Sequence, residues 1–533
     1  MFFLFLFCLL YGENIYMRRS TYIFCVIFTG VIVFLMTIWR FESLIGEGVL
    51  YPFGPDTSIW GKAALLARYN APQTVPPAFP ELVSLMAPGG ALVQGALRAN
   101  ILSAALGVLG CYLGGLWLVS SRGASLLIGA SCAMLALYTF PVFPYMYYIQ
   151  PDIMALAMVS MCGAGLLCVY RYQSTSSVLF LGFWIGMAFS TREHGLVLLA
   201  SCIVFLWWLL RYRSQIWMFL LGVQLGGGLG AGAPYLPFFR PHGGLNGSLT
   251  KAQVALMDTI NQRTENNVVG KTQYEQEAQE STGMIDFLTN VIGQSIEKSA
   301  DFHMALIILL LGAIVLCTRK RGWVVVLIAL SPLLASLVVW TQWRHFFVLL
   351  PIMTILGWGG VSILLYRLFR IWGVIALFGY AIFYSSFLAP YQEYYAKETK
   401  RGLLKQQQRY ASEIQLAKDL KSLDDGQSLL MADPTMSILT GMAPIFLQGK
   451  EVHDPGYPTY PNFVYWTLVV TKKKMSRRWK LLKKSGSYFV YQSLRPSGVD
   501  VRCLKGEWDG PIVERLPQDG VRLRPKKSSG CTP

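Results

Sequence analysis

Long apolar segments separated by short polar turns occupy residues 20–390 of this chain. A helix needs about 20 mainly apolar residues to cross a membrane. The pattern predicts eleven membrane-spanning helices, at residues 21–39, 99–119, 124–141, 153–170, 177–191, 195–210, 215–236, 303–318, 322–340, 346–366 and 371–389. Met17-Arg18-Arg19 stands directly before the first segment and is typical of the start of an uncleaved signal anchor. We therefore interpret residues 1–19 as an N-terminal segment and residues 20–390 as a transmembrane domain.

Basic residues mark alternate ends of the apolar segments. Six clusters lie there: Arg18-Arg19, Arg122, Arg171, Arg211 with Arg213, Arg319-Lys320-Arg321, and Arg367 with Arg370. Short cytoplasmic loops of membrane proteins are enriched in Lys and Arg, so we place all six clusters on the cytoplasmic side. The eleven segments then alternate without conflict, and the remaining loops and the tail face outward. For a bacterial protein this orientation is that of the inner membrane, with the outer loops in the periplasm.

Three hydrophilic stretches interrupt or follow the bundle: the outer loops 40–98 and 239–300, and the tail 391–533. In the first loop, apolar residues recur at helical spacing over residues 57–69, and Asp56 directly before them is a good N-cap residue. This spacing predicts a short helix that lies in the membrane interface rather than across it.

The tail predicts a small extracytoplasmic α/β domain. Its expected elements are a polar helix at 398–423, a strand at 429–432, a helix at 434–441, and strands at 465–471 and 487–492. A lysine-rich run from Lys472 to Lys484 is most simply a solvated helix face, with contact to lipid phosphates as the second interpretation.

Composition supports the membrane assignment, because 54% of the residues are hydrophobic and 14% are charged, against about 25% charged in soluble domains. The net charge of +17 comes largely from membrane flanks and the lysine-rich run, and no nucleic-acid-binding motif accompanies it. The sequence has no GxxxxGK[ST] loop and no CxxC or His/Cys cluster. No cofactor is indicated, and a divalent metal ion stays open because carboxylates near a phosphate suit either case.

Unusual polar residues gather on the outward side of the bundle. They are Asp56, Glu81, Asp152, Arg192-Glu193-His194 and Arg344-His345. Ionisable residues collected at one face of a membrane bundle indicate a functional site. For Asp56 two interpretations compete, a helix cap worth about 1 kcal/mol and a general base for an acceptor hydroxyl.

The order of these motifs resembles the polyprenyl-phosphate-sugar glycosyltransferases of the GT-C superfamily, such as the protein O-mannosyltransferases and the lipid A aminoarabinose transferases. The resemblance covers roughly residues 20–390 and rests on five motifs. They are Gly54-Pro55-Asp56, Pro76-Pro77-Ala78-Phe79-Pro80, Gln150-Pro151-Asp152, the span from Gly182 and Gly186 to Arg192 and Gly195, and Arg344-His345 before Leu350-Pro351. It departs from the family where Thr57 follows Asp56 in place of a second acidic residue, and where Glu81 follows the prolines without a neighbouring Lys.

The resemblance implies transfer of a sugar from a polyprenyl phosphate to a hydroxyl of a glycan, lipid or protein outside the cytoplasm. It implies Asp56 as general base and Asp152 as a second catalytic carboxylate. Arg192 and Arg344 are the expected ligands of the donor phosphate, because guanidinium forks match phosphate oxygens in charge and shape. His194, His345 and Glu81 are expected beside them.

Three rival interpretations remain open. A secondary transporter would also have many spans, but internal repeats and mid-membrane charges are typical of transporters. An O-antigen ligase or polymerase would share the lipid-linked donor, and a non-catalytic assembly subunit would share the layout. The sequence does not identify the sugar, the acceptor, the lipid or the oligomeric state.

Overall fold

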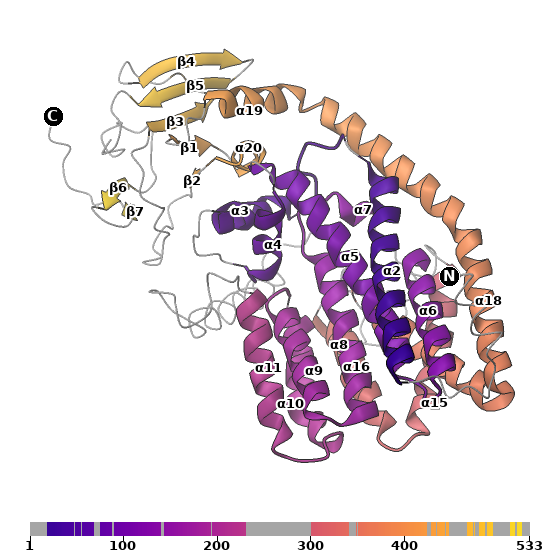
Figure 1. The fold of residues 1–533 in the computed structure, drawn as a ribbon. Coiled ribbons are helices and arrows are strands. Elements are labelled where there is room, and N and C mark those ends of the chain that lie inside the picture. Colours follow the sequence, from indigo (N-terminus) through magenta and orange to yellow (C-terminus); the bar gives the residue numbers. More distant parts are fainter. Residues whose placement is uncertain are drawn as a thin grey trace, which may run out of the picture.

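The computed structural model describes residues 19–230, 300–339, 348–446, 466–493, 512–516 and 520–524, apart from short gaps inside these ranges. The second outer loop 239–300 lies almost entirely outside the described residues, as do Arg344 and His345. The chain is a mostly helical bundle with a small sheet at one end (Figure 1).

Ten helices account for the eleven predicted spans, because the last helix bends at Arg370 and covers two of them. They are α2 (Arg19–Ile45), α5 (Leu92–Leu116), α6 (Arg122–Thr139), α8 (Asp152–Tyr172), α9 (Thr175–Phe189), α10 (His194–Phe205), α11 (Gln215–Gly230), α15 (Ala300–Cys317), α16 (Gly322–Val339) and α18 (Leu350–Gln408). Among the described residues, α2, α5, α8 and α18 are long and apolar enough to cross a membrane by themselves, and α6, α9, α10, α15 and α16 contain shorter apolar helical stretches. The predicted class, an α-helical multi-pass membrane protein with a small α/β tail, is confirmed.

The centre and the rim of the bundle differ in what their side chains face. In α8, 89% of the most apolar window is buried in the protein, whereas in α2 the buried share is 22%. Large apolar side chains on the rim helices are exposed, among them Phe24 and Trp39 on α2 and Phe383 and Phe387 on α18. Because lipid tails solvate such groups, the rim helices are suited to a hydrocarbon environment.

Helices α9 and α11 pack against each other through glycines four residues apart. A Cβ at Gly182 would collide with the carbonyl oxygen of Phe219, and one at Gly226 would collide with that of Phe183. Without a hydrophobic effect between helices in lipid, close backbone approach through small residues is a main source of packing energy. The Gly-rich span noted in the sequence therefore has a structural role on this face.

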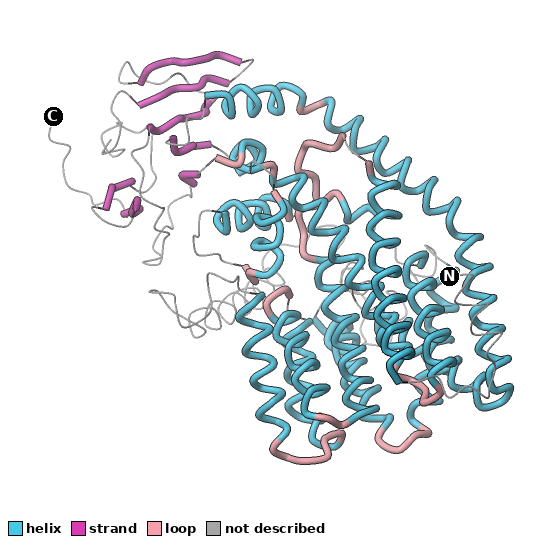
Figure 2. Tube along the Cα trace, in the orientation of Figure 1, coloured by secondary structure: helices cyan, strands magenta, loops and turns pink. Residues whose placement is uncertain are grey.

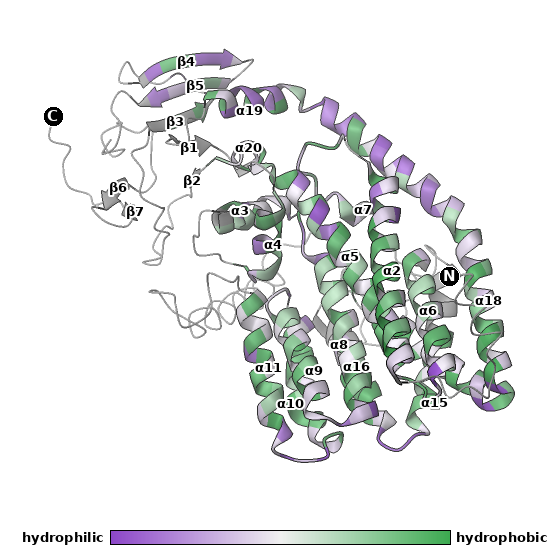
Figure 3. Ribbon diagram, in the orientation of Figure 1, coloured by the Kyte–Doolittle hydropathy of each residue, from purple (hydrophilic) through white to green (hydrophobic). Residues whose placement is uncertain are grey.

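The basic clusters lie at one end of the bundle. The start of α2, the start of α6, the end of α8, the turns α10–α11 and α15–α16 and the bend of α18 all lie at its lower end in Figure 1, where Figure 3 shows hydrophilic loops. Contacts agree with this placement, since Arg319 Nη1 donates to the carbonyl of Leu118 at 3.0 Å and Tyr22 bonds Ser125 at 2.9 Å. The first outer loop and the tail lie at the opposite end.

We expect alkaline phosphatase fused after Gly48 or after Lys397 to be active in a bacterial host, and a fusion after Arg213 to be inactive. The reason is the single basic end, which should stay in the cytoplasm. Enzyme activity normalised to the amount of fusion protein checks the prediction. An inactive fusion after Lys397 beside an active one after Gly48 would mean that the span count is wrong by one.

The first outer loop contains two helices. The first, α3 (Thr57–Arg68), agrees with the interfacial helix predicted from the spacing. The second, α4 (Ala78–Met86), was not predicted, because its start is rich in proline. Pro80 is tolerated there, since the N–H groups of a first helical turn have no partner within the helix.

The tail forms a five-stranded sheet in the order β2-β1-β3-β5-β4, with β1 parallel to both β2 and β3, and β5 antiparallel to β3 and β4. The strands are β1 (Ser428–Ala432), β2 (Pro444–Phe446), β3 (Trp466–Thr471), β4 (Trp479–Ser485) and β5 (Tyr488–Ser493), and β6 (Ile512–Leu516) and β7 (Gly520–Arg524) form a separate pair. The predicted strands at 429–432, 465–471 and 487–492 and the helix α20 (Pro434–Thr440) are present, and α19 (Ala411–Leu423) forms the second part of the predicted polar helix.

The helical interpretation of the lysine-rich run is wrong where the structure describes it. Lys480, Lys483 and Lys484 belong to β4, an edge strand of the sheet, and pairing with β5 holds this segment extended. Lysines on an edge strand keep a charged, solvated rim that discourages pairing with other chains.

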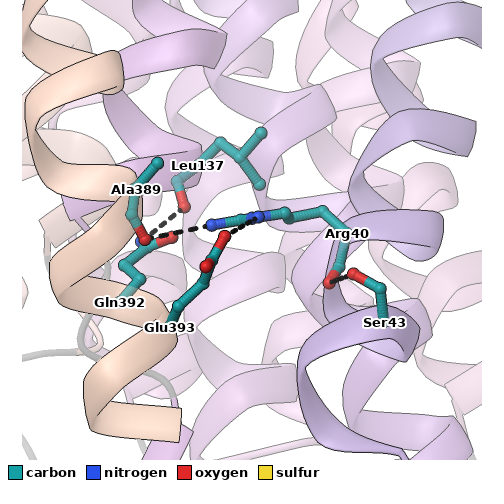
Figure 4. A network of polar contacts seen from close by, with 6 residues as sticks. All are labelled: Arg40, Ser43, Leu137, Ala389, Gln392 and Glu393. Carbon is teal, nitrogen blue, oxygen red and sulfur yellow. Dashed lines mark hydrogen bonds and ion pairs between the residues drawn. The ribbon is translucent and has the colours of Figure 1, made fainter.

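Contacts between α18 and the first loop hold the tail above the bundle. Arg40 at the end of α2 pairs with Glu393 at 3.0 Å and donates to the carbonyl of Ala389 at 3.2 Å (Figure 4). Further along, the amide of Gln407 accepts from the N–H of Leu50 at 2.7 Å. Figure 3 shows that α18 changes from hydrophobic to hydrophilic along its length toward the tail. Figure 2 shows the helix continuing toward the strands. The helix runs through residue 390, and the division into domains at that point stays a prediction.

Helix α20 of the tail packs on α3. The side chain of Ile438 is 1% exposed and belongs to the main hydrophobic core of the bundle, and a Cβ at Gly61 would lie 3.0 Å from its Cγ1. The helix that begins after Asp56 is therefore covered by the tail.

Candidate functional site

Four outer segments meet at the end of the bundle under the tail. They are the α2–α3 loop, the start of α4, the loop from α7 (Phe143–Met146) to α8, and the α9–α10 turn (Figure 1). Each segment carries at least one of the polar residues identified in the sequence. The contacts that hold these segments together therefore determine where the polar residues lie.

The α7–α8 loop is fixed from below by Asn100 on α5. This side chain is fully buried, and its Nδ2 donates toward the carbonyls of Tyr145, Met146 and Tyr148 at 3.3, 3.0 and 3.0 Å. An irregular loop at the end of a membrane bundle needs partners for its backbone groups. Asn100 supplies them and sets the path of the chain into α8.

The α2–α3 loop is joined directly to the α7–α8 loop. Phe53 and Tyr148 form a parallel β-bridge, and the Tyr147 hydroxyl donates to the carbonyl of Ile45 at 3.3 Å. Gly54 has φ +115°, and a Cβ there would lie 3.0 Å from the Tyr148 ring. The glycine of the Gly54-Pro55-Asp56 motif is thus required both by its backbone conformation and by the close approach of the second loop.

Asp56 stands directly before the first residue of α3 and is partly exposed. Its carbonyl accepts from the N–H groups of Ile59 and Trp60, both at 3.1 Å, so its main chain is already part of the first helical turn. This position agrees with the N-cap interpretation, and the residue is not fully buried there.

Asp152 and Arg192 form a buried ion pair. Asp152 is the first residue of α8, Arg192 lies in the α9–α10 turn, and their side chains are 1% and 7% exposed. Oδ1 of the carboxylate faces Nη1 of the guanidinium. The N-terminal end of the α8 dipole further stabilises the anionic carboxylate. The two residues therefore act as one electrostatic unit, a pairing that the sequence did not predict.

Gln150 connects this ion pair to Asp56. With its amide oriented so that both atoms have partners, Nε2 donates to Oδ2 of Asp152 at 3.1 Å and Oε1 accepts from the N–H of Asp56 at 3.1 Å. Gln150 belongs to the Gln150-Pro151-Asp152 motif, but the sequence predicted no role for it. The feature of the sequence that could have indicated this contact is an amide side chain two residues before a carboxylate at the start of a helix.

Glu81 and His194 lie on the neighbouring segments. The N–H of Ala78 at the start of α4 donates to the carbonyl of Ser190 at 2.9 Å, which places α4 beside the α9–α10 turn. Glu81 is in the first turn of α4 and partly buried, and His194 is the buried first residue of α10. The structure thus links Asp56, Asp152 and Arg192 by contacts, places Glu81 and His194 on adjoining elements, and does not describe Arg344 or His345.

The described residues do not assemble a site suited to a divalent cation. Both oxygens of the Asp152 carboxylate face side-chain donors, a guanidinium and an amide. Within the described part of the chain, no group of three or more His, Cys, Asp or Glu side chains is placed to hold a metal ion. Among the described residues, the Asp152 carboxylate is therefore engaged by Arg192 and Gln150.

No protein-family model matches the chain, and no curated protein matches it. Among solved structures, ArnT from Cupriavidus metallidurans bound to undecaprenyl phosphate has 13% identity and a TM-score of 0.48, covering 89% of this chain and 98% of that one. The apo state of that protein gives 12% identity and a TM-score of 0.47 over the same shares. The Archaeoglobus fulgidus oligosaccharyltransferase tethered with an acceptor peptide gives 11% and 0.46, covering 78% of this chain and 64% of that one.

At 11–13% identity and TM-scores below 0.5, such likenesses leave the activity of this chain to be argued from its own residues.

Proposed function

We propose that the protein is a membrane glycosyltransferase that moves a sugar from a polyprenyl phosphate to an acceptor hydroxyl on the outer face of the membrane. The observation that carries the proposal is the frame of two joined loops, in which Asp56 and the buried Asp152–Arg192 pair are connected through one amide. The motif order along the chain supports the same reaction class.

In the proposed reaction, the Asp56 carboxylate takes the proton of the acceptor O–H. The acceptor oxygen then forms a bond to the anomeric carbon as the bond from that carbon to the phosphate oxygen breaks. Polyprenyl phosphate leaves with the electron pair of that bond, and the anomeric configuration is inverted. A general base of this kind must lie within hydrogen-bonding reach of the hydroxyl, and the partly exposed position of Asp56 at the start of α3 permits this.

Charge on the leaving phosphate must be stabilised as the bond breaks. Preorganised cations aimed at developing charge are among the largest contributions to catalysis. We assign this role to Arg344, with His345 beside it, and a supporting role to Arg192. Because Nη1 of Arg192 faces Asp152, we propose that Arg192 acts mainly by holding this carboxylate and adding positive potential to the site.

The location we propose for the site is the periplasmic face of a bacterial inner membrane. The helix ends and turns that carry the described basic residues lie at the other end of the bundle, and the prenyl chain of the donor would lie between the rim helices, in the outer leaflet. The acceptor, a glycan, lipid or protein, would approach under the tail, where α20 covers α3.

Incubating the purified protein with a panel of polyprenyl-phosphate sugars tests this function. We expect stoichiometric appearance of free polyprenyl phosphate and a glycosylated acceptor with at least one member of the panel. Uptake of a solute into proteoliposomes without any transfer would instead favour a transporter.

Replacing Arg344 by Lys should lower kcat/KM for the donor about tenfold or more, because the charge is kept but the fork that binds two phosphate oxygens is lost. Steady-state kinetics with varied donor concentration check this expectation. Arg211→Lys at the opposite end of the bundle is the matched control and should leave kcat/KM unchanged. Wild-type donor kinetics in the Arg344 variant would remove this residue from the site.

A further inference from the structure

Gln150 is buried at the centre of the site, with 2% of its surface exposed, and the proposed reaction does not itself use it. Its amide nitrogen donates to Asp152 and its amide oxygen accepts from the main chain of Asp56, each at 3.1 Å. A single side chain therefore touches both residues that the sequence nominated as catalytic carboxylates.

These two contacts add to the other contacts that hold Asp56 and Asp152 in place. The main chain of Asp56 is held on one side by Gln150 through its N–H and on the other by the first turn of α3 through its carbonyl. The carboxylate of Asp152 is held by Arg192 on one oxygen and by Gln150 on the other. Consequently the direction in which the Asp56 side chain leaves α3 is fixed relative to the buried ion pair.

We infer that Gln150 is a positioning residue for sugar transfer, which keeps Asp56 in register with the Asp152–Arg192 pair. This inference rests on the proposed function. An amide suits the place because it presents a donor to the carboxylate and an acceptor to the N–H at the same time. A carboxylate would place two acceptors there, and a thioether would supply neither strong bond.

The first test is Gln150→Met, which has similar volume and removes both hydrogen bonds. We expect kcat to fall about 10- to 100-fold while the KM for the donor changes less than about twofold, because misplacement of a base by about 1 Å costs this much without altering donor binding. Gln215→Met is the matched control. The Gln215 amide is also buried, donates to Gln173 at 3.0 Å and accepts from Tyr212 at 3.2 Å, but lies at the cytoplasmic end.

The second test is the pH dependence of Gln150→Glu. Burial and the neighbouring Asp152 carboxylate should raise the pKa of the introduced carboxyl, and the Arg192 guanidinium, which already faces Asp152, should offset only part of this rise. In its protonated form the carboxyl again offers one donor and one acceptor, so the ratio of variant to wild-type kcat should rise as the pH falls through that pKa. Gln150→Met should show a flat ratio over the same range. A flat ratio for Gln150→Glu would mean that Gln150 acts through its shape alone and would overturn the inference.

Hydrogen–deuterium exchange of the segment 53–60 supplies a readout that does not depend on activity. Faster exchange in Gln150→Met, with no change in Gln215→Met, is the expected result, because the Asp56 N–H loses its acceptor. Unchanged exchange would overturn the inference even if the proposed function holds. A wild-type protein that transfers no sugar from the panel would refute the proposed function, and the exchange measurement would still decide whether Gln150 holds Asp56.

Discussion

Replacing Asp56 by Asn should yield a folded protein whose turnover is lowered by about 10²–10⁴-fold, the usual contribution of a general base. Asn caps a helix about as well as Asp, so α3 should keep its start and the loop its bridge to Tyr148. The amide cannot accept the proton of the acceptor hydroxyl. The substitution therefore separates the structural role of Asp56 from the chemical one.

Transfer activity and thermal unfolding in detergent should be measured on the same preparation. Glu42→Gln is the control, because Glu42 is exposed near the end of α2 in the same outer region and should tolerate the loss of its charge. Near-normal turnover in Asp56→Asn would reduce Asp56 to a cap and direct attention to Asp152.

The second large effect is expected from breaking the buried ion pair. Asp152→Ala should destabilise the protein by about 3–5 kcal/mol, because it removes the carboxylate that faces a buried guanidinium. It should also abolish transfer, since Asp152 is the group that both Gln150 and Arg192 contact, and its removal leaves neither side chain held in place.

A double-mutant cycle with Arg192→Met separates coupling from the single effects. The doubly substituted protein should be less destabilised than the sum of the two single variants, because neither charge is then left buried alone. Glu393→Ala provides the comparison, since the Glu393 side chain is 45% exposed and its pair with Arg40 should contribute about 1 kcal/mol or less. Additive effects of Asp152→Ala and Arg192→Met would show that the two side chains do not act as a unit.

The rival transporter interpretation is less consistent with this arrangement. The ionisable residues that the structure describes in the site lie at the outer end of the bundle, whereas transporter sites are typically near the middle of the membrane at broken helices. Asp152 at the first residue of α8 and Asp56 before α3 illustrate this placement. This placement of the two carboxylates is more consistent with a chemical step at the membrane surface than with passage of a solute through the bundle.

What the sequence determined by itself is what local chemistry controls. A stretch of about 20 apolar residues is sufficient for a membrane helix, so each predicted span reappears in a helix. The ends were predicted less well: α5 begins at Leu92 instead of residue 99, and α18 continues to Gln408 instead of ending at residue 389. Basic residues at alternate ends predicted that the six clusters share one end of the bundle, and helical spacing predicted α3. Local sequence patterns did not predict α4, whose start is rich in proline. They also predicted a helix for the lysine-rich segment of β4, whose extended form depends on pairing with β5.

Only the tertiary structure decided which polar residues act together. Asp152 and Arg192 are 40 positions apart in sequence, and their pairing depends on how α8 packs beside α9 and on the tight turn into α10. Asp56 comes within reach of Gln150 because Asn100 fixes the α7–α8 loop and the Phe53–Tyr148 bridge joins this loop to the α2–α3 loop. The sequence could nominate the ionisable residues because a charged side chain within a membrane bundle is costly wherever it occurs along the chain. It could not assign their partners, since a contact between side chains is a property of packing and not of spacing.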